Sequence, residues 1–130
     1  MLVKDIMVRD VVTVSAFATI REAMQVMKQR NVKSLVVEKR HENDAFGIIT
    51  YTNILKTIVA EEGDIDLINV YDVCAKPAIV LSRELEIKHA ARLMVNLGIR
   101  RVLVTYNNEI EGIITMNDIV GAILEIADGE

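Results

Sequence analysis

The apolar and polar positions of this chain form one pattern that occurs twice. Sliding the sequence along itself by 67 residues places Val3–Glu42 on Val70–Glu109. After a two-residue contraction in a loop, Gly47–Val59 falls on Gly112–Leu124. A fixed period indicates one supersecondary unit used repeatedly, in which each copy covers the apolar face of the other. For two copies we expect closure about a pseudo-two-fold axis rather than an open array.

Within each copy the pattern predicts a short strand, a helix, two further strands and a second helix. In the helix predicted over Thr19–Arg30, apolar residues recur at i, i+3, i+4 and i+7, the spacing of one buried helix face, and the second copy repeats this stripe. Asn31 and Gly98 follow these helices, and both residue types tolerate the left-handed conformation that ends a helix. The expected strands are Val11–Val14, Leu35–Glu38 and Phe46–Thr50 in the first copy, and Ala78–Leu81, Val102–Thr105 and Gly112–Thr115 in the second.

Polar segments separate these elements. Tyr106–Glu111 is expected to connect two strands, and the acidic end Asp128–Glu130 is expected to fray. We assign residues 1–60 to the first repeat, the acidic residues 61–69 to a linker and residues 70–126 to the second repeat. Near-continuous apolar strands predict sheets that are covered on both faces. The expected fold class is therefore mixed α/β (α+β), with two β-α-β-β-α repeats packed through their sheets with pseudo-two-fold symmetry.

Composition excludes several classes of function. The chain has 130 residues, of which 52% are hydrophobic, enough for a compact core. Its net charge of −4 argues against a protein that binds the phosphate backbone of nucleic acids, which needs a basic face. Aromatic residues make up 4% and tryptophan is absent, so platforms for stacking single-stranded bases are not expected. We therefore expect no nucleic-acid partner.

The residues that bind metals or form disulfides are few. Cys74 is the only cysteine and is expected to be a small buried apolar residue, while His41 and His89 are expected to be solvated. These residues form no metal-ligand cluster. The N-terminus lacks the apolar stretch of a signal peptide, and no run of about 18 apolar residues is present to span a membrane. We expect a cytoplasmic protein with no metal site and no membrane insertion.

The strongest local motif is the junction between the last strand and the last helix of each copy. It reads GIIT-x-x-N over Gly47–Asn53 and GIIT-x-x-D over Gly112–Asp118. A threonine followed three residues later by an acidic residue is typical of a helix N-cap. A helix start with free amides, a hydroxyl and a carboxylate also suits a sugar diol or an anion. The spacing alone leaves both interpretations open.

The paired copies, the order of elements and the two GIIT junctions resemble a tandem pair of CBS domains, the cystathionine-β-synthase type regulatory module. Val3–Met7 resembles the opening segment of that family, and Gly98–Val104 resembles the strand that follows its first helix. The resemblance covers roughly Met1–Glu125. It implies a module with two composite clefts, which in this family commonly bind adenine nucleotides or S-adenosylmethionine. It also implies a disc-shaped homodimer.

Carried over residue by residue, the resemblance implies two unequal sites. In the family, the Thr and Asp of one repeat hold the ribose, the early strand of the other repeat covers the base, and the start of its next strand approaches the phosphates. Ile48 and Ile113 would add apolar walls. One site would combine Thr50 and Asn53 with Ile79, Arg100 and Arg101, and the other would combine Thr115 and Asp118 with Val12, Lys33 and Ser34.

The chain departs from the family pattern at Asn53. A carboxylate accepts hydrogen bonds from both ribose hydroxyls with charge-assisted strength, and an amide does not do so equally. In this site Arg100 and Arg101 would compensate by binding phosphate oxygens. Adjacent residues of a regular strand point to opposite faces, so we expect only one of the two arginines to enter the cleft. Affinity there should depend on phosphates, whereas the Asp118 site, with only Lys33 for charge, should accept uncharged or cationic adenosyl ligands better.

These observations lead to hypotheses from three classes. The leading one is a stand-alone regulatory or sensor module that binds AMP, ADP, ATP or S-adenosylmethionine and signals to an unknown partner protein. The alternative is a ligand-free structural or dimerisation module, favoured by Asn53 and Ser34, in which the basic residues are solvated strand ends. A nucleotide-converting enzyme is disfavoured, because the sequence offers no nucleophile with a base, no catalytic carboxylate pair and no metal ligands. We therefore expect a homodimer that is not an enzyme and that takes a regulatory ligand rather than a cofactor.

Overall fold

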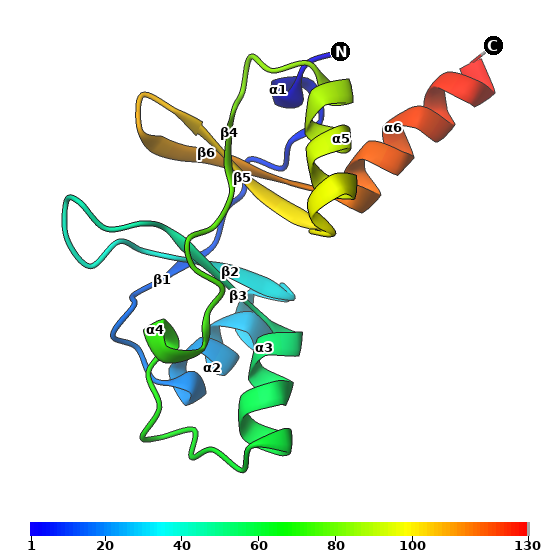
Figure 1. The fold of residues 1–130 in the computed structure, drawn as a ribbon. Helices are drawn as coiled ribbons and strands as arrows, with labels where there is room; N and C mark the ends of the chain where they lie inside the picture. The colour runs from blue at the N-terminus through cyan, green and yellow to red at the C-terminus, as the bar shows by residue number, and fades with distance from the viewer. Residues whose placement is uncertain (130) are drawn as a thin grey trace. The chain divides into compact units, whose positions relative to one another are not determined.

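The computed structural model describes residues 1–129 (Figure 1). It contains two three-stranded sheets, each accompanied by helices, so the mixed α/β class and the order of elements in each repeat are as predicted. The elements of the first repeat are α1 (Val3–Ile6), β1 (Thr13–Val14), α2 (Ile20–Arg30), β2 (Ser34–Val37), β3 (Gly47–Thr50), α3 (Tyr51–Leu55) and the π-helix η1 (Lys56–Ala60). Those of the second are α4 (Val70–Val73), β4 (Val80–Ser82), α5 (Ile87–Leu97), β5 (Arg101–Tyr106), β6 (Glu109–Thr115) and α6 (Met116–Gly129).

The chain forms two compact units. The first-sheet unit comprises Val12–Ala78 and contains β1, β2 and β3. The second-sheet unit comprises Met1–Val11 and the chain from Ile79 onward, and it contains β4, β5 and β6. The units are therefore offset from the sequence repeats, because the N-terminal segment of each repeat belongs to the unit that holds the other repeat's sheet.

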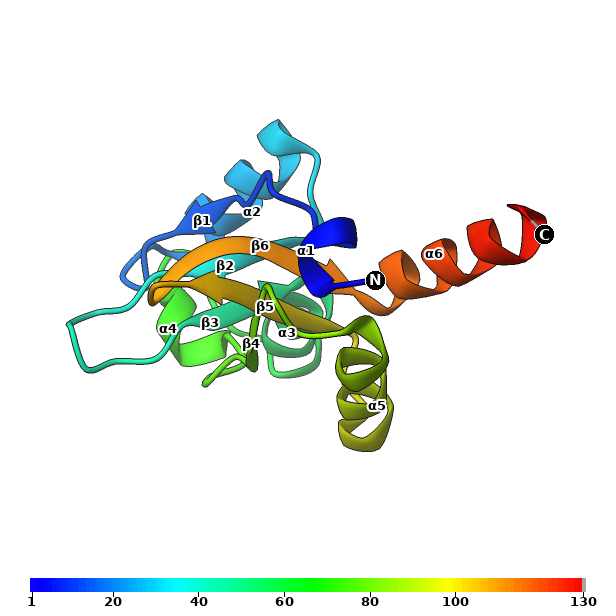
Figure 2. The same ribbon diagram turned by 90° about the horizontal axis from the view of Figure 1, so that it is seen from above.

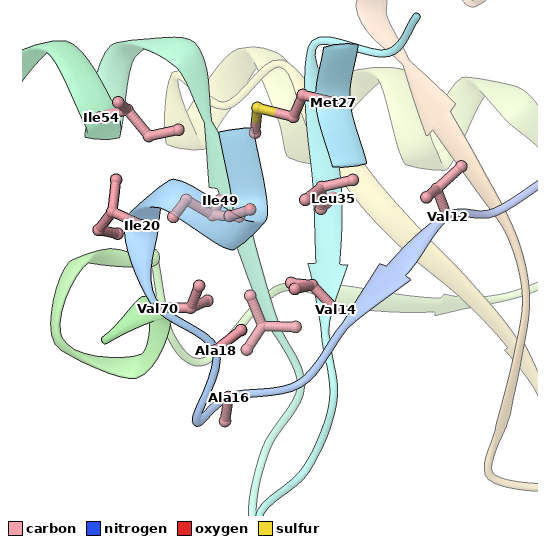
Figure 3. Close-up of a cluster of buried hydrophobic side chains, with 12 residues drawn as sticks. Val12, Val14, Ala16, Ala18, Ile20, Met27, Leu35, Ile49, Ile54 and Val70 are labelled. Atoms are coloured by element: carbon pink, nitrogen blue, oxygen red, sulfur yellow. The ribbon is translucent and has the colours of Figure 1, made fainter. Parts of the chain in front are cut away.

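The two exchanged segments, residues 1–11 with α1 and residues 70–78 with α4, are anchored by buried side chains. Val3 of α1 is fully buried in the second-sheet core with Met94 and Ile114. Val70 of α4 is fully buried in the first-sheet core, where Figure 3 shows it near Ala18. The sequence pattern did not predict this exchange, because both segments are apolar and periodicity does not say which core each one joins.

The glycine at the start of each GIIT junction lets the exchanged segment pass close to the strand that contains this glycine, β6 in one unit and β3 in the other. Beyond each short helix the chain forms an isolated bridge to that strand, between Val8 and Ile113 in one unit and between Ala75 and Ile48 in the other. A Cβ on Gly112 would lie 2.9 Å from the Val8 carbonyl oxygen, and the nearest backbone atom to a Cβ on Gly47 would be 3.2 Å away. The repeated glycine thus has a packing reason in both copies.

Helix α2 covers the first sheet with the stripe that the sequence predicts. Ile20, Ala23 and Met27 are buried in one cluster with strand residues such as Leu35 and Ile49. Figure 3 shows Ile20 and Met27 in this cluster. Thr19 caps the helix by accepting a hydrogen bond from the Glu22 N–H. The predicted helix ends are confirmed, because Asn31 and Gly98 adopt the left-handed conformation, with φ of 53° and 65°.

Strand register brings the start of one strand beside each junction. In the first sheet β1 runs parallel to β2, β2 runs antiparallel to β3, and Ser34 lies opposite Thr50. In the second sheet β4 runs parallel to β5, β5 runs antiparallel to β6, and Arg101 lies opposite Thr115. The threonine of each junction therefore neighbours the first residue of the preceding strand in its own unit.

Several boundaries differ from the predictions. The predicted connection Tyr106–Glu111 is mostly strand, because Asn107 and Asn108 both take positive φ and form a two-residue turn that lets β5 and β6 extend further. The expected frayed end is helical through Gly129, and Glu130 lies outside the described residues. In Figures 1 and 2, α6 leads away from the sheet of its own unit.

Candidate functional site

The junction of the second repeat forms a reciprocal helix cap. The Thr115 N–H donates to Asp118 Oδ2 over 2.9 Å, and the Asp118 N–H donates to Thr115 Oγ1 over 3.1 Å. Both side chains are partly exposed. Among residues 1–129 the Asp118 carboxylate makes no other hydrogen bond, so Oδ1 is available as a charged acceptor. The capping interpretation is confirmed here, and it leaves capacity for a ligand.

The junction of the first repeat uses the same cap with an amide. The Thr50 N–H donates to Asn53 Oδ1 over 2.9 Å, and the Asn53 N–H donates to Thr50 Oγ1 over 3.3 Å. The Thr50 hydroxyl also donates to Asn53 Oδ1 over 3.0 Å. The only oxygen of the Asn53 side chain is therefore engaged in the cap, and its remaining polar group is an NH₂ donor. The two repeats differ at this position in charge and in free acceptors.

A pocket of about 380 Å³ lies beside the second junction, inside the second-sheet unit. Arg101 lies opposite Thr115 in the sheet, and the Arg100 carbonyl accepts a hydrogen bond from the Met116 N–H over 2.9 Å. Neither arginine forms an ion pair within the described part of the chain. The pocket therefore combines two guanidinium groups with the start of α6, and its lining residues are Arg100, Arg101, Thr115, Met116 and Asn117.

Both arginines line this pocket, whereas the expectation that only one of them enters the cleft with Thr50 and Asn53 stays a prediction. Strand β5 begins at Arg101, so Arg100 lies in the bend before the strand and the alternation of strand faces does not apply to it. The sequence interpretation also missed Met116 and Asn117. Their place directly after the capping threonine, on the first turn of a helix, was the available signal.

The corresponding residues of the first repeat lie beside their own junction. Ser34 pairs with Thr50 in the sheet, and the Lys33 carbonyl accepts a hydrogen bond from the Tyr51 N–H over 3.4 Å. Lys33 is exposed and Ser34 is partly buried. In each unit, the capping threonine thus lies next to two residues at the start of the neighbouring strand. Both of these residues are cationic in the second repeat (Arg100 and Arg101), whereas only Lys33 is cationic in the first. The combinations across repeats that the resemblance implies stay predictions.

The predicted apolar walls lie along the sheets. Val12 and Ile48 are buried in the first-sheet unit, whereas Ile79 and Ile113 are partly buried in the second. The Val12 carbonyl accepts from the Val36 N–H, and the Ile79 carbonyl accepts from the Leu103 N–H, so both residues occupy equivalent places just before the first strand of their sheets. Their proposed contact with a base is a prediction.

Two charged clusters away from the pocket connect each exchanged segment to the β2–β3 or the β5–β6 hairpin of its own unit. Lys76 Nζ donates to Asp44 Oδ2 over 2.7 Å, and Arg40 Nε donates to the same oxygen over 3.1 Å. These bonds hold the pKa of Asp44 well below its usual range. The second-sheet unit has a similar cluster, in which Glu111 accepts from Arg83 over 2.9 Å and from Arg9 over 3.3 Å. These ion pairs link residues of each exchanged segment to its unit.

Other chemistry-bearing residues form no second centre in the described chain. Among residues 1–129 no group of three or more His, Cys, Asp or Glu side chains is placed to hold a metal ion. Cys74 is partly buried, and its burial raises the pKa of the thiol. His41 and His89 are exposed, as predicted. None of the helices over the same residues has the length and apolar character needed to cross a membrane.

Comparison with known proteins identifies relatives of both repeats. An uncharacterized protein of Methanopyrus kandleri is 32% identical over 113 residues, which cover 86% of this chain and 57% of the relative. The CBS domain-containing protein YhcV of Bacillus subtilis is 30% identical over 117 residues, which cover 90% of this chain and 81% of YhcV. The chain thus spans little more than half the length of the Methanopyrus relative.

Solved structures share the fold. The hexameric CBS-CP12 protein from bloom-forming cyanobacteria superposes with a TM-score of 0.84 at 37% identity, covering 92% of this chain and 69% of that protein. The CBS domain pair of protein MJ0100, solved in complex with 5′-methylthioadenosine and S-adenosyl-L-methionine, gives a TM-score of 0.79 at 25% identity over 95% of this chain and 99% of that one. A family model for the CBS domain matches residues 3–60 and again residues 70–125. The chain therefore belongs to the CBS domain family and is a tandem pair of its repeats.

Proposed function

We propose that this chain is a regulatory module that binds an adenosyl ligand and signals its occupancy to a partner protein. The observation that carries the proposal is the second-sheet pocket, where Arg100 and Arg101 meet the helix start capped by Thr115 and Asp118. Support also comes from the MJ0100 CBS pair, which was solved with two adenosyl compounds. CBS pairs are generally regulatory rather than catalytic, and we propose no reaction at this pocket. The expected location is the cytoplasm.

The pocket offers a different group for each part of such a ligand. The unused Oδ1 of Asp118 would accept hydrogen bonds from ribose hydroxyls with charge-assisted strength. Arg100 and Arg101 would donate to phosphate oxygens, to which planar guanidinium groups are well matched. The positive end of the α6 dipole favours an anion at the same place. Met116, partly buried in the lining, would add apolar surface.

This geometry changes which ligand we expect at the Asp118 site. From the sequence, that site had only Lys33 for charge and was expected to accept cationic adenosyl ligands better. With two arginines beside Thr115 in the same unit, a cationic sulfonium meets like charge, whereas phosphates meet opposite charge. We therefore propose AMP, ADP or ATP as the ligand of this pocket in preference to S-adenosylmethionine.

Signalling requires that the ligand bind two arrangements of the protein unequally. Only a difference in affinity between conformations shifts their populations. The junction residues lie between β6 and α6, so a ligand held by Asp118 and Arg101 would bias the angle at which α6 leaves the sheet. A partner that contacts α6 would then detect the occupied state.

A thermal-shift panel tests the proposal with wild-type protein and AMP, ADP, ATP, NAD and S-adenosylmethionine. A ligand at 100 times its dissociation constant adds about 2.7 kcal/mol to the free energy of unfolding, which raises the melting temperature measurably. We expect larger shifts from phosphorylated ligands, and the shift should disappear in Arg101→Ala. Arg92→Ala, which changes an exposed arginine on α5, is the matched control and should keep the shift. No shift with any of the five compounds would refute the proposal.

The second candidate is a ligand-free dimerisation module, favoured by the exposed apolar residues on the second helices of the repeats, such as Leu55, Val59 and Leu124. Mass spectrometry of small molecules that co-purify with the protein separates the candidates, because only the first predicts a bound nucleotide.

Both candidate functions include self-association of the chain. Closed two-fold dimers are the commonest assembly, so we expect a species of about 29 kDa, twice the 14.6 kDa chain, by light scattering at micromolar concentration.

A further inference from the structure

The first-sheet unit carries an aromatic pair on its surface. Phe17, in the turn before α2, meets Tyr71 of α4 edge to face, with ring centroids 5.9 Å apart and ring planes at 71°. Phe17 is nevertheless 62% exposed and Tyr71 is 37% exposed. The guanidinium carbon of Arg40 lies 5.7 Å from the centroid of the Tyr71 ring, within reach of a cation–π interaction. Phe17, Tyr71 and Arg40 form a surface that we call the aromatic patch.

The backbone that holds this pair is repeated in the second-sheet unit. The 67-residue period places Phe17 on Glu84 and Tyr71 on Lys4. The N–H groups of Phe17 and Glu84 each donate to a serine hydroxyl two residues earlier, over 3.2 and 3.1 Å. The N–H groups of Tyr71 and Lys4 donate to the carbonyls just before Phe17 and Glu84, both over 3.0 Å. The four side chains therefore leave equivalent backbone positions.

The side chains at these equivalent positions differ in character. Lys4 Nζ and Glu84 Oε2 form an ion pair over 3.2 Å, with side chains that are 37% and 51% exposed. An exposed ion pair contributes little to stability, so the fold tolerates ordinary polar residues here. In the first repeat the same positions instead leave aromatic surface in contact with water. Because the fold itself does not require rings at this place, the aromatic pair indicates contact with another molecule.

The cations beside the pair have unused hydrogen-bond donors. Arg40 bonds Asp44 through Nε, and among residues 1–129 its two terminal nitrogens form no hydrogen bond. The Asp44 side chain is 7% exposed and also accepts from Lys76, so it does not compete for those donors. Lys39 Nζ lies 4.9 Å from the centroid of the Phe46 ring and forms no ion pair in the same part of the chain. Exposed rings are thus flanked by donors that suit carboxylates.

We propose that the aromatic patch docks an acidic segment of a partner protein, in which an aliphatic or aromatic anchor lies beside two or more carboxylates. Aromatic and arginine side chains are enriched where protein interfaces gain most of their affinity. The anchor would cover the Phe17 ring, and the carboxylates would accept hydrogen bonds from Arg40 and Lys39. Nucleic acid is a poorer match, because the net charge of −4 opposes binding of a phosphate backbone. This inference does not depend on a ligand in the second-sheet pocket.

Transplanting the polar pair of the second repeat tests the patch. The transplant variant combines Phe17→Glu with Tyr71→Lys and so carries the residues of the Lys4–Glu84 ion pair. It should fold, because the equivalent backbone already holds that pair, and thermal unfolding checks this. Phe17→Ser, which removes only the more exposed ring, is a second variant that keeps the test decisive if the double change unfolds the protein.

Short random peptides, displayed on phage and selected on immobilised wild-type protein, supply the probe. We expect enrichment of sequences that combine a leucine or an aromatic residue with two or more Asp or Glu residues. In fluorescence anisotropy these peptides should bind the transplant variant at least about tenfold more weakly than wild type. Tyr106→Ala is the matched control and should bind like wild type. Its ring also lies beside an arginine, Arg83 at 3.4 Å, but that guanidinium already donates to Glu111.

Three results would overturn the inference. The first is a selection that enriches no acidic sequences, and the second is equal affinity of the enriched peptides for the wild type and the transplant variant. The third is a transplant variant that loses self-association in sedimentation velocity, which would assign the patch to a contact between copies of the chain. The thermal shift with ATP should be the same in the transplant variant and the wild type, so failure of this inference leaves the ligand proposal standing, and the reverse.

Discussion

Replacing Asp118 by asparagine would separate the two tasks that we assign to its side chain. The first repeat already has an asparagine at the corresponding position, and there the Thr50 N–H donates to Asn53 Oδ1 over 2.9 Å. The Thr115 N–H donates to Asp118 Oδ2 over the same 2.9 Å. Because the amide supports an equivalent cap, Asp118→Asn should keep the helix start and lose only the negative charge and its second acceptor oxygen.

The expected loss is in ligand affinity rather than in stability. A hydrogen bond to a charged group contributes about 1.5–3 kcal/mol, and one between neutral groups about 0.5–1.5 kcal/mol. Asp118→Asn should therefore cost about 1–1.5 kcal/mol, or about 5- to 13-fold in affinity. Asp118→Ala removes the acceptor altogether, which should cost about 10- to 150-fold in affinity and about 1 kcal/mol of stability from the lost cap.

Titration calorimetry with adenosine and ATP measures these affinities, and thermal unfolding of the same samples measures stability. We expect affinity to fall in the order wild type, Asp118→Asn, Asp118→Ala, with the melting temperature reduced only in the alanine variant. Equal affinities of all three proteins for every adenosyl ligand that the wild type binds would show that the carboxylate is only a cap. The ribose assignment would then be wrong.

Three further variants test the site and the fold. Arg101→Ala should reduce the affinity for ATP or ADP more than that for adenosine, and added salt should weaken wild-type ATP binding preferentially; equal losses in calorimetry would make this arginine structural. Hydrogen bonds from basic neighbours hold the pKa of Asp44 below its usual range, so its carboxylate stabilises the fold above the unfolded-state pKa of about 3.9, and this contribution is lost as the pH falls below that value. Asp44→Asn should therefore lower the melting temperature near pH 7 and differ less from wild type near pH 3, whereas an equal difference at both pH values would contradict this account. Gly112→Ala should destabilise the fold by about 1–3 kcal/mol, because its Cβ would lie 2.9 Å from the Val8 carbonyl oxygen. In denaturant unfolding, Gly121→Ala, which meets no atom within 4 Å on a helix, is the control and should gain about 0.5–1 kcal/mol; similar effects of both changes would refute the packing reason.

Local patterns in the sequence were sufficient for the element types and for the caps. The stripe over Thr19–Arg30 predicted α2, because a helix face is decided by residues within a few positions of one another. The left-handed helix ends at Asn31 and Gly98 and the reciprocal caps at Thr50 and Thr115 were predictable for the same reason, since donor and acceptor lie three or four residues apart. The duplication itself is visible in the sequence and gave both the family resemblance and the repeated glycine.

Contacts between distant residues were decided only by the tertiary structure. Strand register, set by packing over the whole sheet, brings Arg101 opposite Thr115, fourteen positions later in the chain, and so collects both arginines in one pocket. The exchange of α1 and α4 between units depends on which core each apolar segment fills, and two nearly equivalent segments carry no local signal for that choice. Uncovered apolar surface is likewise a property of packing, because Ile119 and Val120 are alike in sequence, yet one is 2% and the other 45% exposed. Periodicity reports which residues prefer burial, and only the folded chain determines which neighbours bury them.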